Sequence, residues 1–288
     1  MVLMWRKCRC GVTVFVRTSH TVLCLGVAVS LLVKKTALRT ALVEFQDPAY
    51  GLSYLFVLLF SLAMYFLACL VDPGYLPLQN GTWSRVPNNN SDEEHGDEEE
   101  GMADETRALD RTNRQRPCDY CEIRQPMRSK HCEECNQCVR KYDHHCPWLD
   151  VCVGERNHKF FWIFLLSMSV LILWSLHITR TAMVHELLWS DWFSSNVVFL
   201  IDLAILLPSG FVVGGLVSFH TYLMVRGLTT WEVVSRERIS YLKKLDDDHN
   251  PFNEGCMHNV LHFLASMNTR HWESIYSRRV NVKQAGIV

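Results

Sequence analysis

The sequence predicts an α-helical polytopic membrane protein with four transmembrane helices and a Cys-rich polar domain between the second and the third. Two observations carry this prediction. The 288 residues have a mean hydropathy of only +0.02, yet their apolar residues are pooled in long blocks. Seven of the twelve Cys lie between Cys118 and Cys152, interleaved with His. The 29 basic and 30 acidic residues are balanced, which argues against a nucleic-acid binder, since such proteins carry a basic excess.

Three segments meet the requirement of about 20 consecutive apolar residues for a helix that crosses a bilayer. Residues 52–71 carry no charge, residues 160–180 carry one only at their end, and residues 197–225 carry only Asp202. The last segment is long for one crossing, so we expect it to tilt or to kink near Pro208. Asp202 could be a buried functional carboxylate. Because it lies close to the non-cytosolic end of the span, we expect the carboxylate to reach water.

Residues 12–33 form the first span, which Arg17 and His20 interrupt. A cleaved signal peptide is the alternative interpretation, with the basic residues of the preceding segment 1–11 as its flank. The apolar run ends in Lys34-Lys35 without a convincing small-residue cleavage site, which favours a span.

Basic residues orient the four spans. Both termini, residues 1–11 and 226–288, share one side with the loop between spans two and three. With Arg17 of the first span counted, that side carries 25 Lys and Arg, and the opposite side carries 4. We therefore expect the termini and the Cys-rich domain to be cytosolic, and the sequons at Asn80 and Asn89 to be unmodified.

The loop has two parts. Residues 79–115 are Asn/Ser-rich and then acidic, as expected of a solvated, disordered linker. An acidic partner-binding segment is the alternative. Residues 116–158 form the Cys-rich domain, where pairs of Cys separated by two residues match the spacing of tetrahedral zinc sites in a reducing compartment. The candidate ligands are seven Cys and three His: Cys118, Cys121, His131, Cys132, Cys135, Cys138, His144, His145, Cys146 and Cys152.

Two closed structural zinc sites consume eight of these ten candidates, so two are left for chemistry. The run Asp143-His144-His145-Cys146 in this Cys-rich frame resembles the DHHC-type protein S-acyltransferases, or palmitoyltransferases. The resemblance covers about residues 10 to 270. Further matching motifs are Asp72-Pro73-Gly74 after the second span, Asn157, Thr229-Thr230-Trp231-Glu232 after the fourth span, and Asn259 in a short amphipathic stretch of the C-terminal tail.

The resemblance implies how the ligands pair. One zinc ion takes Cys118, Cys121, His131 and Cys138, and the other takes Cys132, Cys135, His145 and Cys152. His144 and Cys146 remain, in agreement with the ligand count.

The resemblance also implies the reaction and its setting. Cys146 would take a long-chain acyl group from palmitoyl-CoA as a thioester and pass it to membrane-proximal cysteines of cytosol-facing substrate proteins. His144 would act as the base, and Asp143 would fix its tautomer. The family works mostly on Golgi and endoplasmic reticulum membranes.

Two other classes of protein remain as alternatives. A membrane-bound zinc scaffold, such as a RING-like adaptor, predicts no spare Cys/His pair beside a carboxylate. A transporter usually has more charged residues within its spans.

Several further residues have both a functional and a plain interpretation. Basic residues of the Cys-rich domain could bind the phosphates of CoA, or they could be ordinary surface charge. The candidates are Arg128, Lys130, Arg140 and Lys141. His158 could be a spare zinc ligand, but we expect it at the surface. Asp72, Thr230 and Asn259 are expected to act in capping and packing.

Overall fold

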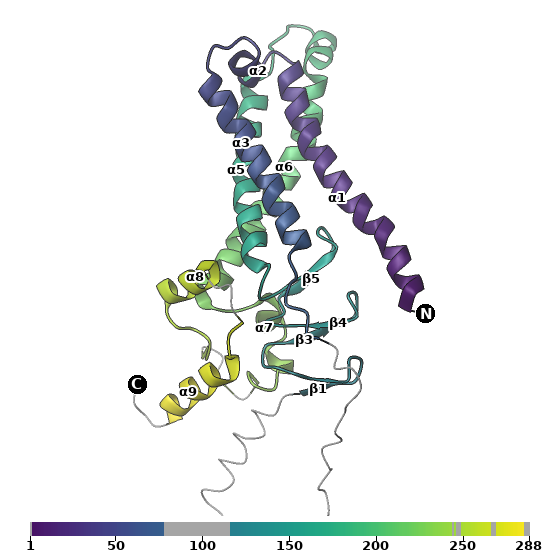
Figure 1. The fold of residues 1–288 in the computed structure, drawn as a ribbon. Coiled ribbons are helices and arrows are strands. Elements are labelled where there is room, and N and C mark those ends of the chain that lie inside the picture. The colour runs from purple at the N-terminus through teal and green to yellow at the C-terminus, as the bar shows by residue number, and fades with distance from the viewer. Residues whose placement is uncertain (1, 78–115, 244, 246–248, 266–268, 285–288) are drawn as a thin grey trace, which may run out of the picture. The chain divides into compact units, whose positions relative to one another are not determined.

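The computed structural model describes residues 2–77, 116–243, 245, 249–265 and 269–284. Four long helices dominate it: α1 (Val2–Val33), α3 (Pro48–Leu70), α5 (His158–Ala182) and α6 (Trp189–Arg226) (Figure 1). All four are long and apolar enough to cross a membrane, which confirms the predicted four-span fold class. The predicted linker 79–115, with both sequons, lies outside the described residues.

The chain divides into two compact units. The first contains Met1–Asp72, His145–Val153 and Asn157–Met224, and therefore the four long helices with the short α2 (Ala37–Leu42). The second contains Pro73–His144, Gly154–Arg156 and Val225–Val288, and therefore most of the Cys-rich domain and the C-terminal segment.

Local sequence explains where α3 begins and ends. Asp47 caps its N-terminus by accepting a hydrogen bond from the backbone amide of Tyr50 at 3.1 Å. Pro48 occupies the first turn, where its missing N–H costs nothing. The helix ends at Val71, whose backbone is extended, shortly before Pro73.

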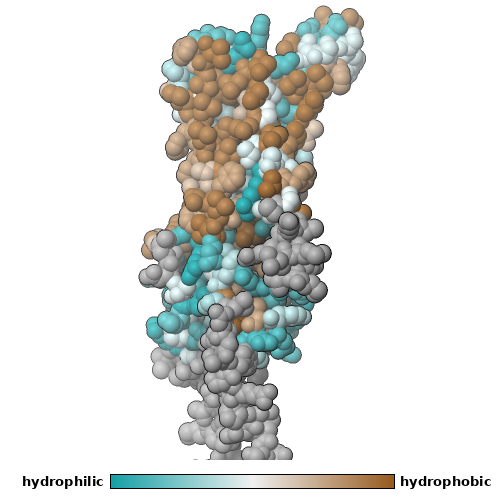
Figure 2. Space-filling model, turned by 45° about the vertical axis from the view of Figure 1, so that its right-hand side comes forward, coloured by the Kyte–Doolittle hydropathy of each residue, from teal (hydrophilic) through white to brown (hydrophobic). Residues whose placement is uncertain are grey.

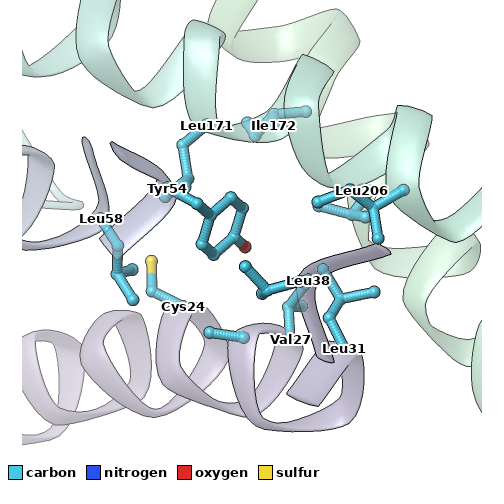
Figure 3. Close-up of a cluster of buried hydrophobic side chains, with 11 residues drawn as sticks. Cys24, Val27, Leu31, Leu38, Tyr54, Leu58, Leu171, Ile172 and Leu206 are labelled. Carbon is cyan, nitrogen blue, oxygen red and sulfur yellow. The ribbon is translucent and has the colours of Figure 1, made fainter. Parts of the chain in front are cut away.

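The core of the helical unit is centred on Tyr54 of α3, which is 1% exposed (Figure 3). Around it lie Leu31 of α1, Leu171 of α5 and Leu206 of α6. The Tyr54 hydroxyl lies 2.9 Å from Oγ of Ser175, so its polar atom is satisfied within the core. The same four helices are therefore held by one apolar cluster.

Large apolar side chains also point outward from these helices. Phe15, Phe56, Leu173 and Phe211 are among the exposed ones, and such residues form the brown areas over the helices in Figure 2. An exposed apolar surface of this extent is the surface that a helix presents to lipid.

α1 begins at Val2, ahead of its candidate span Gly11–Val33. One expectation for the spans needs correction. Asp202 of α6 does not reach water, because it is only 4% exposed and accepts a hydrogen bond from Oγ of Ser30 at 2.6 Å. Ser30 of α1 is therefore the hydrogen-bond partner of the Asp202 carboxylate, which we had expected to lie in water because of its position in the sequence. α6 itself is one helix that continues through Pro208.

Three short antiparallel hairpins make up the Cys-rich domain. They pair β1 (Arg116–Cys118) with β2 (Ile123–Gln125), β3 (Lys130–Cys132) with β4 (Gln137–Val139), and β5 (His144–Cys146) with β6 (Val151–Val153). Each connecting turn contains a non-glycine residue with positive φ: Glu122, Asn136 and Asp150. These tight turns fold the Cys-x-x-Cys segments back on themselves.

The C-terminal segment contains α7 (Thr230–Val234), the 3₁₀ turn η1 (Arg236–Arg238), α8 (Cys256–Ala265) and α9 (Trp272–Gln284). Its core contains Leu242, Phe252, Trp272 and Tyr276. α8 coincides with the predicted amphipathic stretch, and its Met257 and Leu261 are exposed while Asn259 is buried.

Candidate metal centres and active site

One complete metal-ligand set lies within the second unit. The ligand atoms of Cys118, Cys121, His131 and Cys138 all lie within 4.8 Å of one another. Nδ1 of His131 is 3.2 Å from Sγ of Cys121, and His131 pairs directly opposite Cys138 in the β3–β4 register. Three thiols and one imidazole form a closed tetrahedral donor set of the kind that zinc prefers.

Gln125 supports this set from β2. Its Nε2 donates to Sγ of Cys138 at 3.1 Å. A donor to a ligand sulfur stabilises the thiolate form that a metal requires.

The remaining Cys/His residues give a second set compatible with one zinc ion: Cys132, Cys135, His145 and Cys152. His145 and Cys152 face each other across the β5–β6 hairpin, with 3.8 Å between Nδ1 and Sγ. Cys132 ends β3, and Cys135 lies in the turn that follows it. Two Cys/His sets thus account for eight of the ten candidate ligands, as the count predicted.

Cys146 belongs to neither set and lies in the helical unit. It is 8% exposed and packs among apolar side chains of α3 and α5, including Tyr65, Phe161 and Phe164. Asn157 secures this region because its Nδ2 donates to the backbone oxygen of Cys152 at 2.9 Å and to that of Ala68 at 3.1 Å. The thiol is therefore held where the end of α3 meets the start of α5.

Sequence analysis missed one contact near this thiol. His20 of α1, noted only as an interruption of the first span, accepts a hydrogen bond from Nε1 of Trp148 at 3.2 Å and stacks on Tyr65. Tyr65 in turn donates to the backbone oxygen of Trp148 at 3.0 Å. An imidazole near the end of an apolar helix was the available signal, but its partner lies 128 residues away.

Asp143 and His144 form a hydrogen-bonded pair in the second unit. Nδ1 of His144 lies 2.7 Å from Oδ2 of Asp143, whose side chain is completely buried. In a neutral ring with Nδ1–H donating to the carboxylate, Nε2 carries the lone pair and can accept a proton. The pair has the arrangement of a base and the carboxylate that orients it.

Thr230 holds Asp143 from the C-terminal segment. Its backbone amide donates to Oδ1 of Asp143 at 2.9 Å, and its hydroxyl donates to Oδ2 at 2.7 Å. Thr229 and Glu232 form a capping box around the start of α7, which fixes the backbone of Thr230. The amide of Thr230, in the first turn of α7, has no partner within the helix, and it donates instead to the carboxylate of Asp143.

Glu232 also forms a buried ion pair with Arg128. Its oxygens accept from Nε of Arg128 at 2.7 Å and from Nη2 at 2.5 Å, and both side chains are 1% exposed. The Arg128 guanidinium lies 4.1 Å from the ring centre of Phe252 and 4.4 Å from that of Trp272. Arg128 is thus a structural cation, which argues against its being a phosphate ligand.

The other basic candidates also have protein partners. Arg140 forms an ion pair with Glu155 at 3.0 Å. Burial, aided by the nearby positive charge of Arg128, lowers the pKa of Lys141 to about 8. Nζ of Lys130 lies 3.5 Å from the ring centre of Trp231.

The Asp72-Pro73-Gly74 motif continues from α3 into the second unit. Gly74 has φ +106°, and its oxygen accepts from the amide of Arg140 at 2.9 Å. Leu76 then donates to the oxygen of Cys138 at 2.9 Å. The motif therefore turns the chain so that it runs along β4, the strand that carries a zinc-ligand candidate.

The expectation for His158 is wrong, whereas Asn259 packs as expected. His158 is not at the surface, because it is 4% exposed and its Nε2 lies 3.0 Å from Nδ1 of His220. Asn259 has the packing role expected of it: its amide donates to the oxygen of Val225 at 2.7 Å and accepts from the amide of Glu254 at 3.1 Å.

The chain is similar to known proteins over most of its length. Residues 111–237 match the family model for DHHC palmitoyltransferases. Palmitoyltransferase ZDHHC12-A of Danio rerio is 35% identical over 266 residues, which is 92% of this chain and 95% of the relative. Palmitoyltransferase ZDHHC12 of Homo sapiens is 35% identical over 264 residues, which is 92% of each chain. The Mus musculus protein of the same name is 34% identical over 272 residues, which is 94% of each.

Proposed function

The chain belongs to the DHHC palmitoyltransferase family and is a protein S-acyltransferase, and we propose that Cys146 is its nucleophile. The Cys146 thiolate attacks the thioester carbonyl of palmitoyl-CoA, the bond from that carbonyl to the CoA sulfur breaks, and CoA leaves as its thiol. A substrate cysteine then attacks the acyl-enzyme, and Cys146 is released. Both steps exchange one thioester for another, so no oxidant and no activated water is needed.

We propose His144 as the base that this reaction needs. A free thiol has a pKa of about 8.5, so at cytosolic pH an adjacent base must take its proton. Nε2 of His144 takes the proton from the attacking thiol and returns it to the leaving sulfur. Asp143, hydrogen-bonded to Nδ1, keeps the ring in the required tautomer and stabilises the imidazolium.

The two zinc ions have structural roles in this proposal. Cys118, Cys121, His131 and Cys138 would hold one ion. The second set includes His145, which is bonded directly to both His144 and Cys146 in the chain. When bound, a zinc ion fixes the backbone on either side of its ligands, and the catalytic residues are positioned in this way.

The single observation that carries the assignment is the position of Cys146 among apolar side chains of α3 and α5. A thiol at the end of membrane helices suits a donor whose chain is buried in the bilayer, because burial stabilises an acyl chain by about 0.8 kcal/mol per CH₂. The acceptors are then cysteines close to the membrane surface. The excess of basic residues predicts that both termini and the Cys-rich domain are cytosolic, in Golgi or endoplasmic reticulum membranes.

Intact mass of the detergent-purified chain tests the nucleophile. Incubation with palmitoyl-CoA should add one palmitoyl group, about 238 Da, as a hydroxylamine-labile thioester that maps to Cys146. Cys146→Ser should keep both zinc ions and show no gain, whereas Cys256→Ser, at an exposed cysteine, should be acylated like the parent protein. Full acylation of the Cys146→Ser variant would refute the mechanism. No gain by the parent protein, with two zinc ions bound, would favour a zinc scaffold.

A further inference from the structure

The second unit contains a cavity that the acyl-transfer steps do not use. Its volume is about 120 Å³. Three segments form its walls: residues 125–130, from the end of β2 to the start of β3, the chain from Trp231 through η1 to Tyr241, and the start of α9 at Glu273. Arg116 of β1 completes the lining.

Positive charge dominates this cavity. Arg116, Lys130 and Arg238 line it, and two of these cations lie near Trp231, with Lys130 at 3.5 Å and Arg238 at 5.6 Å from the ring centre. Arg128 also contributes to the wall, but Glu232 neutralises its charge. Three cations therefore face one lining carboxylate, that of Glu273.

The carboxylate of Glu273 restricts which anions the cavity can bind. Its Oε1 accepts a hydrogen bond from the backbone amide of Met127 at 2.7 Å, so this carboxylate is fixed in the wall. A fixed negative charge disfavours a multiply charged phosphate more than a single carboxylate. The ring of Trp231 offers a surface for the aliphatic part of an amino-acid side chain. The lining thus favours Asp and Glu side chains of a peptide over a phosphate group.

The cavity shares an element with the catalytic pair. Trp231 follows Thr230, whose amide and hydroxyl hold Asp143, and precedes Glu232 of the same capping box. A peptide bound against Trp231 therefore contacts the short helix α7 that orients Asp143.

We propose that this cavity recognises acidic side chains in the protein substrate, near the cysteine that receives the acyl group. This inference rests on the proposed function, since it concerns the second, acceptor step. The acidic side chains form ion pairs with Arg116 and Arg238, and the peptide packs on Trp231. The cavity thereby selects among cysteines that are otherwise equally close to the membrane.

The test uses the full chain and two synthetic peptides. Each peptide has one cysteine and the same length, but one carries Glu and the other Gln at the flanking positions. The variant is Arg116→Gln/Arg238→Gln, because both side chains are exposed and both line the cavity. Arg278→Gln/Arg279→Gln on α9 is the matched control, since these exposed cations do not line the cavity.

The expected result separates the two steps. Loading of Cys146 from palmitoyl-CoA should be unchanged in both variants. Transfer to the Glu peptide should fall roughly three- to tenfold in Arg116→Gln/Arg238→Gln, as for the loss of two exposed ion pairs, and transfer to the Gln peptide should not. The control variant should resemble the parent protein, whose preference for Glu should weaken as salt is added.

Other results would overturn the proposal. An equal loss of transfer to both peptides in Arg116→Gln/Arg238→Gln would show that the cavity does not recognise acidic side chains. A raised KM for palmitoyl-CoA during loading would assign it to the donor. Faster transfer to both peptides would show that acidic residues of the chain itself occupy it. If the parent protein does not load at all, the proposed function fails, and fluorescence anisotropy of the labelled Glu peptide then tests recognition independently: binding weakened by Arg116→Gln/Arg238→Gln supports it, and no binding refutes it.

Discussion

The hydroxyl of Thr230 donates to Oδ2 of Asp143 at 2.7 Å, although 87 positions separate the two residues. The same oxygen lies 2.7 Å from Nδ1 of His144. A residue of the C-terminal segment therefore helps to orient the carboxylate that orients the proposed base. The Thr-Thr-Trp-Glu motif has two separate functions: Thr229 and Glu232 build the start of a helix, and Thr230 uses that start to hold Asp143.

Replacement of Thr230 by Val should slow acylation of Cys146 by about tenfold, because one of the hydrogen bonds that position Asp143 is lost. Thr230→Ser keeps the hydroxyl and should restore most of the rate. The measurement is the rate of acyl-enzyme formation over a range of pH. A positioning role predicts that Thr230→Val changes the pH profile of acylation and that Thr230→Ser does not. An unchanged pH profile with full activity would contradict it.

Glu232→Gln should destabilise the second unit by about 3 kcal/mol, because it leaves the Arg128 guanidinium buried without its counter-charge. The double variant Arg128→Met/Glu232→Leu removes both charges and should be more stable than Glu232→Gln alone. Thermal unfolding in detergent, followed by the fluorescence of Trp272 and the other tryptophans, measures the difference. If the double variant were destabilised relative to the parent protein by the sum of the effects of Arg128→Met and Glu232→Leu measured singly, the two residues would not be coupled.

Cys138→Ala should lower the zinc content from two ions to one, because it opens one Cys/His set and leaves the other complete. Zinc released by a thiol reagent and counted with a metal indicator reports the stoichiometry. Cys256→Ala, at an exposed cysteine outside both sets, should retain both ions. Retention of two ions by Cys138→Ala would show that Cys138 is not a ligand.

Lys141 should make stability depend on pH. Burial lowers its pKa from 10.5 to about 8 in the folded protein, so between these values the unfolded chain binds more protons than the folded one. The free energy of unfolding therefore rises with pH across this window, and the cost of the buried charge is fully present below pH 8. Relative to Lys141→Met, the parent protein should gain about 3 kcal/mol between pH 8 and 10.5. Parallel curves for the two proteins would contradict this, since all other groups titrate in both.

The large elements could be predicted from sequence. A backbone in hydrocarbon must satisfy its hydrogen bonds within its own helix, so a sufficiently long apolar block specifies a span without any knowledge of its neighbours. The fold class follows from this, and it is confirmed. The Cys-x-x-Cys spacing is local in the same sense, because a tight turn brings the two sulfurs together. The ligand count then left two of the ten candidates over, and the family resemblance implied that these are His144 and Cys146.

Residues whose partners are distant in sequence could not be predicted in this way. Asp202 and His158 were expected at water and are buried, because Ser30 and His220 lie beside them. Gly154 drew no attention, yet a Cβ there would come within 2.6 Å of the oxygen of Pro73. Nothing in the neighbouring sequence of any of these residues indicates its partner.

The sequence by itself determined the four helices and the number of candidate zinc ligands, because these depend on hydropathy, spacing and count along a short stretch of chain. The pairing of the ligands and Cys146 as the nucleophile are what the family resemblance implies. Only the tertiary structure decided that Thr230 holds Asp143, that Glu232 neutralises Arg128, and that Arg116 and Arg238 line the same cavity. Those relationships arise when packing brings distant segments within hydrogen-bonding or ion-pairing distance. Side-chain direction and burial set them, and a linear pattern contains neither.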